Sequence, residues 1–255
     1  MPRLIGFSTG ALAFGAYDRG LAEVRAHALE AVELSALRQP ELEPLVDAIH
    51  DLDLSGFQYI AFHAPSEIAA GTERRVVELL LRIAERGWPI VVHPNVIADY
   101  SLWNQMGSAL CIENMDKRKP IGRTATEIES LLERLPKASL CFDIGHARQI
   151  DSTMTEAYFI LSRFGTKLRQ VHVSEVNTRS QHDALSFASM LAFRSVAEMI
   201  PADVPLIVES VVQPSQIDAE IERVREAFPV VEAVVGAHDL TRPAGVTPRL
   251  LWQPT

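Results

Sequence analysis

Acidic residues and histidines follow one short apolar segment after another along this chain. The stretch LCFDIGH (140–146) passes from apolar residues into Asp143 and reaches His146 three residues later. Residues in similar positions elsewhere in the chain are Glu33, His63, His93, Glu113, His172 and Glu209. Carboxylates and imidazoles bind metal ions and transfer protons, so the pattern predicts one of these kinds of chemistry if the fold gathers the residues.

The segments that carry these residues have the composition of buried parallel strands. Each is about five residues long and is apolar on both faces. They are LIGFS (4–8), AVELS (31–35), YIAFH (59–63), PIVVH (89–93), LCIEN (110–114), LCFDI (140–144), QVHVS (170–174) and LIVES (206–210). Helical patterns lie between most of them, most clearly at 72–86, 124–135, 186–200 and 215–228. In the second of these helices, Thr126 and Glu129 have the spacing of a capping box.

Eight strands that alternate with helices at intervals of about 30 residues predict a (β/α)8 barrel. A chain of 255 residues has an ordinary length for one such domain, so we expect a single α/β TIM-barrel domain over residues 1–255. The alternative is a doubly wound sheet, but no glycine-rich phosphate-binding fingerprint follows any strand. In a barrel, the polar residues at the strand ends would meet at one face.

Several carboxylates buried in one place need a compensating cation. Without it, desolvation and repulsion between like charges would cost many kcal/mol. We therefore predict a divalent metal at the mouth of the barrel. For any single residue, and above all for a single histidine, the alternative is a hydrogen-bonded polar group with a structural role.

An ordered set of short motifs resembles the xylose-isomerase-like TIM-barrel superfamily. The motifs are HAP (63–65), VVHP (91–94), IEN (112–114), FDIGHA (142–147), VHVSE (171–175) and VES (208–210), and together they cover nearly the whole chain. This superfamily includes sugar isomerases and epimerases as well as the endonuclease IV type of abasic-site nuclease. Because each motif is short, the resemblance indicates the fold and metal binding more strongly than the substrate.

The resemblance implies roles for individual residues. Glu113, Asp143, His172 and Glu209 match the four ligands that hold one divalent metal in the epimerase branch. Oxygen-rich ligation with one imidazole suits Mn²⁺, Mg²⁺ or Co²⁺ and tolerates Zn²⁺. His146 matches a histidine that faces the substrate in epimerases or binds a further zinc in the nuclease.

The nuclease branch implies additional metal ligands. His63 and His93 match its ligands for a second metal, which is bridged by the glutamate that corresponds to Glu113. In the epimerase interpretation, His63 binds substrate instead. His182 falls near the last histidine of the nuclease, but Ser180 stands where the nuclease has an aspartate. The sequence therefore departs from the nuclease at its third metal site.

Four other residues are candidates at the mouth of the barrel. We expect Glu33, Trp103 and Arg148 to bind substrate, and Glu175 to fix the orientation of the His172 ring. The alternatives are a strand-end ion pair for Glu33, a core position for Trp103, and solvated surface positions for Arg148 and Glu175.

Two reactions are compatible with such a site. The favoured one is isomerisation or epimerisation of a sugar or a sugar-like hydroxy-carbonyl compound, in which the metal stabilises an enediolate while Glu113 and Glu209 exchange the proton. The alternative is hydrolysis of a phosphoester by two metals that share Glu113. A metal-binding barrel without activity is a third interpretation.

Composition limits the partners. With 33 acidic and 24 basic residues, the net charge of −9 does not favour nucleic acid, and we expect no Lys/Arg-rich loop. A small sugar or sugar phosphate is the expected partner. The apolar run at the N-terminus is too short for a signal peptide or a membrane span, and Cys111 and Cys141 are expected to be buried free thiols, so we expect a cytoplasmic enzyme. Short loops would leave the mouth open, so a homo-oligomer could complete the pocket.

Overall fold

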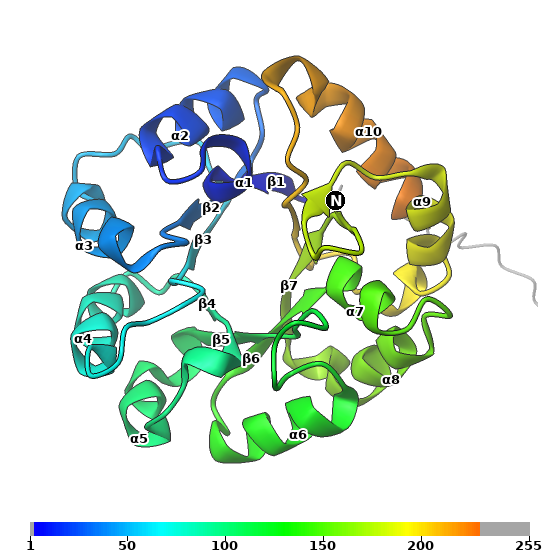
Figure 1. Ribbon diagram of the computed structural model, residues 1–255. Coiled ribbons are helices and arrows are strands. Elements are labelled where there is room, and N and C mark those ends of the chain that lie inside the picture. Colours follow the sequence, from blue (N-terminus) through cyan, green and yellow to red (C-terminus); the bar gives the residue numbers. More distant parts are fainter. Residues whose placement is uncertain (1–2, 230–255) are drawn as a thin grey trace, which may run out of the picture.

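Eight parallel strands close into a barrel in the computed structural model, which describes residues 3–229 (Figure 1). They are β1 (Ile5–Ser8), β2 (Ala31–Ser35), β3 (Tyr59–His63), β4 (Ile90–Val92), β5 (Leu110–Glu113), β6 (Ser139–Asp143), β7 (Leu168–Val173) and β10 (Leu206–Val208). The last strand, β10, closes the barrel by pairing with both β1 and β7. The predicted (β/α)8 barrel is confirmed. Residues 230–255, which the single-domain prediction includes, lie outside the described residues.

Helices surround the barrel, and most of them cover its outer face (Figure 1). They are α1 (Thr9–Ala13), α2 (Tyr17–Ala26), α3 (Gln39–Ala48), α4 (Glu73–Ala84), α5 (Tyr100–Trp103), α6 (Ala125–Arg134), α7 (Ile144–Ile150), α8 (Thr155–Phe164), α9 (Phe187–Arg194) and α10 (Ile217–Ala227). In α4, the buried residues Val76, Leu80 and Ile83 recur at intervals of three or four and belong to the hydrophobic core. The core therefore lies between the helices and the strands, and it holds the strand ends in fixed positions.

The start of α6 differs from the sequence expectation. The capping box expected at Thr126 and Glu129 is wrong, because the helix begins two residues earlier. Thr124 is the N-cap, and its hydroxyl accepts a hydrogen bond from the backbone N–H of Glu127 at 3.3 Å. The Glu127 carboxylate accepts one from the backbone N–H of Arg123 at 2.7 Å. Thr124 and Glu127 have the same Thr-x-x-Glu spacing as Thr126 and Glu129, so the local pattern alone does not show which pair caps the helix.

A short β-hairpin follows β7 and forms a two-stranded sheet that is separate from the barrel sheet. Its strands are β8 (Glu175–Val176) and β9 (His182–Asp183), which pair in antiparallel fashion. The sequence patterns did not indicate this hairpin. Within residues 3–229, no helix has both the length and the hydrophobicity needed to cross a membrane.

Gly145 lets α7 follow β6 without a break. A Cβ atom at this position would lie 2.4 Å from the carbonyl oxygen of Ser174 and 2.8 Å from Cγ2 of Val176. The nearest atom belongs to the backbone, so it cannot move aside by a change of rotamer. The glycine of the DIGH motif is therefore required by the close packing of α7 against the end of β7.

We expect Gly145→Ala to destabilise the protein by about 1–3 kcal/mol through overpacking. Equilibrium urea unfolding measures this loss. Gly165→Ala is a matched control, because Gly165 has φ −53° and a Cβ atom there would meet no other atom within 4 Å. The control should be neutral or slightly stabilising. An unchanged free energy of unfolding for Gly145→Ala would contradict the proposed steric role.

Candidate metal centre

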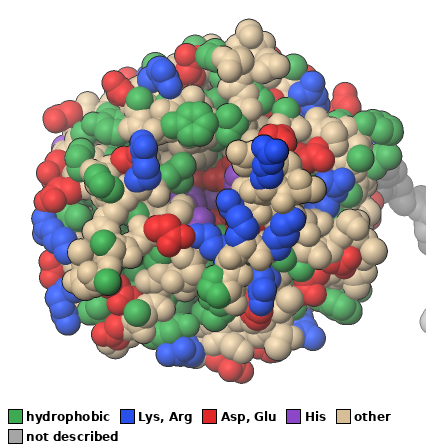
Figure 2. Space-filling view, viewed as in Figure 1, with side chains coloured by type: hydrophobic (Ala, Val, Ile, Leu, Met, Phe, Trp, Pro, Cys, Tyr) green, Lys and Arg blue, Asp and Glu red, His purple; other side chains and the backbone are tan. Residues whose placement is uncertain are grey.

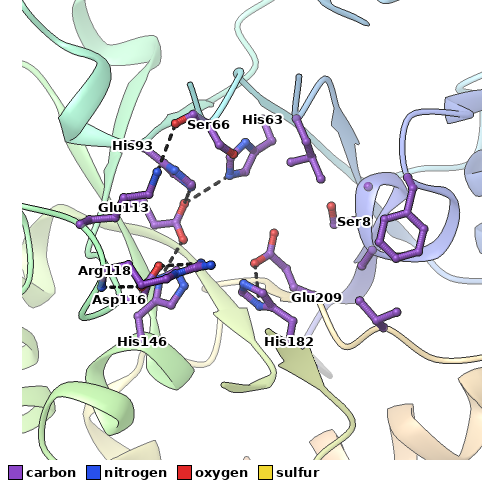
Figure 3. Close-up of a pocket in the computed structure, with 16 residues that line it drawn as sticks. Ser8, His63, Ser66, His93, Glu113, Asp116, Arg118, His146, His182 and Glu209 are labelled. Carbon is purple, nitrogen blue, oxygen red and sulfur yellow. Dashed lines mark hydrogen bonds and ion pairs between the residues drawn. The ribbon is translucent and has the colours of Figure 1, made fainter. Parts of the chain in front are cut away.

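The polar strand ends meet at the C-terminal mouth of the barrel, where a pocket opens above them (Figure 3). The pocket contains about 730 Å³ of space, part of which is open solvent. Glu33, His63, Glu113, Asp143, His146, His172 and Glu209 are all buried, and the side chain of His93 is 12% exposed. In Figure 2, acidic and histidine side chains lie at the bottom of a central hollow.

Glu113 lies at the centre of this cluster. Its Oε2 is 3.2 Å from Nε2 of His63 and 3.2 Å from Nε2 of His93. Its Oε1 is 3.3 Å from Nδ1 of His146 and 3.5 Å from Nδ1 of His172. The two oxygens of one carboxylate therefore face two different sets of histidines.

Overlapping groups of side chains have donor atoms close enough to share an ion. In each group, one ligand atom per residue lies within 4.8 Å of the others. The groups are His63, His93 and Glu113; Glu113, Asp143, His172 and Glu209; Asp143, His146 and His182; and Glu33, His63, His172 and Glu209. The structure thus brings together both ligand sets that the sequence motifs implied, and Glu113 belongs to both.

Several buried donor atoms of the cluster have only ion-pair contacts and no hydrogen bond. Two of them are Oδ2 of Asp143, which lies 3.3 Å from Nδ1 of His146, and Nδ1 of His172, which lies 3.3 Å from Oε2 of Glu209. The other oxygen of Asp143, Oδ1, accepts a hydrogen bond from the backbone N–H of His146 at 2.7 Å and so caps α7. Buried polar atoms are rarely left without a partner, so these two atoms indicate room for a cation. The donor set fits a divalent metal by this test.

Neighbouring groups fix the orientation of the histidine rings. Nδ1–H of His63 donates to the carbonyl oxygen of Ala64 at 2.7 Å, which leaves Nε2 to face Glu113. Nε2 of His172 lies 3.0 Å from Oε2 of Glu33, which leaves Nδ1 to face the cluster. Such contacts fix the tautomer and the direction of a metal-binding imidazole.

Asn114 links the ends of two strands. Its side-chain amide donates to the carbonyl oxygen of Asp143 at 2.8 Å and accepts from the backbone N–H of Asp143 at 2.7 Å. The backbone carbonyl oxygen of Asn114 lies 2.9 Å from Nδ1 of His146. Asn114 belongs to the IEN motif, but no role was predicted for it from the sequence. The sequence feature that could have indicated this role is the side-chain amide directly after the strand-end residue Glu113.

The pKa values of the histidines reflect an excess of negative charge. Burial lowers the pKa of His63, but the hydrogen bond to Glu113 and the surrounding carboxylates raise it to about 9. Burial likewise opposes the charged form of His146, but Asp143 and Glu113 raise its pKa to about 10. Protons on these rings therefore compensate the carboxylates, and a divalent cation would supply the same compensation.

The carboxylates respond to burial and to these histidines in different ways. Burial raises the pKa of Asp143, and although the charge of His146 lowers it, the charges of Glu113 and Glu209 add to the rise. For Glu209, burial raises the pKa, but the charge of the nearby His172 ring lowers it to about 2. Of the three carboxylates Glu113, Asp143 and Glu209, Asp143 is thus the one whose charged form its surroundings disfavour.

The structure places Glu33 and Glu175 differently from the arrangement expected around His172. Glu33 does not line the pocket. It is fully buried behind His172, where Gln170 also donates to its Oε2 at 2.6 Å. Glu175 does not support His172, because its carboxylate lies 3.2 Å from Arg148 and accepts from the backbone N–H of Ser186. Glu33 takes the role that was expected of Glu175, because β2 places it beneath the ring of His172.

The expected substrate contacts of Trp103 and Arg148 are also corrected. Trp103 is fully buried between helices, and its indole N–H donates to Glu73 at 2.6 Å. Arg148 is held by Glu175, and neither Trp103 nor Arg148 is among the described residues that line the pocket. By contrast, His63 and His146 do line it.

Residues of the loop between β5 and α6 were missed. Asp116, Arg118 and Lys119 line the pocket, and the loop also contains Lys117 and Arg123. The expectation of no Lys/Arg-rich loop is therefore wrong. The sequence feature that could have indicated this basic loop is the stretch DKRK (116–119), which begins one residue after the strand-end motif IEN.

His182 lines the pocket and lies 3.7 Å from Glu209, whereas His27 and His50 lie away from the centre and His238 lies outside the described residues. His27 pairs with Asp218 at 2.6 Å, and His50 lies 2.9 Å from a guanidinium nitrogen of Arg86, both in exposed settings. Cys111 and Cys141 are buried and free, as predicted.

Comparisons with known proteins identify the fold. No family model matches the sequence, and no curated protein matches it. Among solved structures, an endonuclease IV from Thermus thermophilus is 19% identical with a TM-score of 0.61, over 89% of this chain and 98% of that chain. An L-ribulose 3-epimerase is 15% identical with a TM-score of 0.55, over 89% of this chain and 92% of that chain.

A third structure extends the comparison. A xylose isomerase-like TIM barrel protein from Mycobacterium smegmatis, in complex with magnesium, is 11% identical with a TM-score of 0.53, over 89% of this chain and 97% of that chain. This chain therefore has the fold of the xylose isomerase-like TIM barrels, and the resemblance first seen in the short motifs is confirmed for the fold.

Removal of the carboxylate behind His172 should weaken metal binding. We expect Glu33→Gln to lower the affinity for Mn²⁺ or Zn²⁺ by about 10- to 100-fold, because the ring loses the partner that fixes its tautomer. Competition with a chelating dye measures the affinity. Glu30→Gln is the control, since Glu30 lies on the surface and bonds to Gln58. Equal affinities for the wild type and Glu33→Gln would contradict this role.

Metal binding should release protons. His63 is protonated at pH 7, given its pKa of about 9, whereas a ligating imidazole must be neutral. The proton on His146, whose pKa is about 10, compensates the same carboxylates that an ion would neutralise. The apparent affinity should therefore rise between pH 6 and pH 8, by about tenfold per pH unit for each proton displaced. Calorimetry in buffers with different ionisation enthalpies counts these protons. A binding enthalpy that is identical in all buffers would count against the scheme.

Proposed function

We propose that this protein is a metal-dependent phosphoester hydrolase in which two divalent ions share Glu113. The observation that carries the proposal is the geometry of that carboxylate. One oxygen faces His63 and His93 at 3.2 Å each, and the other lies on the side of His172. A site for one metal does not need both of these additional histidines.

The chemistry of the ligands supports a pair of ions. When bound, two divalent ions held about 3.5–4 Å apart activate water and stabilise the leaving oxygen of a phosphoester. His63, His93 and one oxygen of Glu113 would hold the first ion. The other oxygen of Glu113 would hold the second ion together with Asp143, His172 and Glu209. The likeness of the fold to endonuclease IV is compatible with this arrangement.

The protein supplies the rigidity that such chemistry needs. Every one of these ligands except His93 is buried, and all of them stand at the ends of barrel strands or directly after them. Asn114 and Glu33 fix Asp143 and His172 from behind. The ligands therefore need little rearrangement when ions bind.

An isomerase or epimerase of a sugar-like compound is the second candidate. It is favoured by the complete four-ligand group and by the position of Glu113 and Glu209, which both line the pocket. Burial raises the pKa of each of these carboxylates, but the nearby histidines lower it by more. Each carboxylate is therefore ionised and able to accept a proton. This reaction would use one metal and would not depend on His93.

His93→Ala separates the two reactions. We expect the wild-type protein to hold at least two ions per chain and to hydrolyse 4-nitrophenyl phosphate or its diester. The variant should lose one ion and at least about a hundredfold in the rate of hydrolysis, because one of the two charges that stabilise the transition state is gone. Metal analysis and absorbance assays provide the two readouts.

His50→Ala is the control, because His50 lies on the surface beside Arg86. It should match the wild type in metal content and in rate. If the wild type holds a single ion and exchanges protons of a ketose with deuterated solvent, and if His93→Ala leaves that exchange unchanged, the isomerase is the correct function.

A further inference from the structure

The loop between β5 and α6 carries positive charge to the side of the pocket. Arg118 and Lys119 line the pocket next to the acidic and histidine cluster. In Figure 3, Arg118 reaches from this loop toward the space above Glu113 and His146. Figure 2 shows lysine and arginine side chains beside the central hollow.

A buried carboxylate holds the Arg118 side chain in place. Oδ1 of Asp116 accepts hydrogen bonds from the backbone N–H of Arg118 at 2.8 Å and from its Nε–H at 3.0 Å. Oδ2 of Asp116 accepts one from Nη2 at 3.2 Å. Asp116 is 1% exposed, whereas the side chain of Arg118 is 56% exposed. The guanidinium is thus anchored on one edge and open on the other.

The open edge of Arg118 retains hydrogen-bonding capacity. A guanidinium has five N–H donors, of which Asp116 engages two, so its remaining donors are available to a ligand. Lys119 adds a second cation at the same side, with its side chain 13% exposed and Nζ 2.6 Å from Glu67. A planar guanidinium fixed beside metal ligands is suited to bind the oxygens of a phosphoryl group.

The opposite side of the pocket is apolar. It is formed by Ala11, Phe14, Leu37 and Val211. Phe14 is 62% exposed and Val211 is 43% exposed, so a large apolar area faces the solvent at this rim. Apolar side chains exposed beside a polar cluster are typical of a site that covers an organic group.

We propose that Arg118, anchored by Asp116 and assisted by Lys119, is the subsite that binds the phosphoryl group of the substrate, while Phe14 packs against its organic part. The substrate class is a small phosphate ester with an apolar or planar organic group. This inference rests on the proposed function, because it assigns the substrate of that same site. It adds the residues that select a charged ester over a neutral sugar.

Inorganic phosphate and phenyl phosphate test the subsite in the metal-loaded protein. Calorimetry should show that Arg118→Gln weakens the binding of both by about 10- to 100-fold, the loss expected for charge-assisted hydrogen bonds. Arg123→Gln is the matched control: Arg123 lies in the same loop and pairs with Glu127 but does not line the pocket. Its affinity for both compounds should equal that of the wild type.

Phe14→Ala tests the apolar side separately. It should leave the binding of inorganic phosphate unchanged and weaken that of phenyl phosphate by about tenfold. Equal phosphate affinities for the wild type and Arg118→Gln, or no phosphate binding to the metal-loaded wild type, would overturn the subsite. Failure of the proposed function has a different signature: phosphate binds through Arg118, but no phosphoester is hydrolysed.

Discussion

The mutual repulsion of buried carboxylates is the interaction on which this site depends. Glu33, Glu113, Asp143 and Glu209 lie within a small volume at the mouth of the barrel, and all are buried. Such an arrangement is stable only where positive charge balances it. Protons on the histidines supply part of that charge, as the raised pKa values of His63 and His146 indicate, and divalent ions would supply more.

The barrel holds these charges close together despite their repulsion. Parallel strands surrounded by helices fix each ligand at the end of a rigid segment, and the hydrophobic core around them determines where each segment ends. Links such as Asn114 to Asp143 and Glu33 to His172 then orient the donor atoms. The polar cluster thus depends on a small number of strand ends, while the loop between β5 and α6 adds basic side chains at the edge of the pocket.

The fold and the clustering of acidic and histidine side chains could be predicted from the sequence because both follow from local patterns. Short apolar runs indicated the strands, and the polar residue after each run indicated the ligands. Contacts between distant segments were not readable in this way. Glu33 was expected in the pocket but lies behind His172, because the sequence does not reveal which face of the strand end a side chain occupies. Trp103 was expected in the pocket but is fully buried, and its indole N–H donates to Glu73 of another helix, a contact that local patterns do not reveal.

The contribution of the loop residues was the least predictable part. Arg118 and Lys119 stand in a polar stretch without periodicity, and only the hydrogen bonds to Asp116 show that the arginine is held at the pocket. The hairpin that carries His182 consists of two-residue strands, which are too short for a recognisable alternation.

The central claim is that the carboxylate of Glu113 bridges two ions. Electron paramagnetic resonance of the protein loaded with Mn²⁺ tests it most directly, because two bridged Mn²⁺ ions are magnetically coupled whereas an isolated ion gives a six-line signal. We expect a coupled signal at saturation, and we expect Glu113→Gln to abolish it. An isolated six-line signal from the saturated wild-type protein would contradict the account.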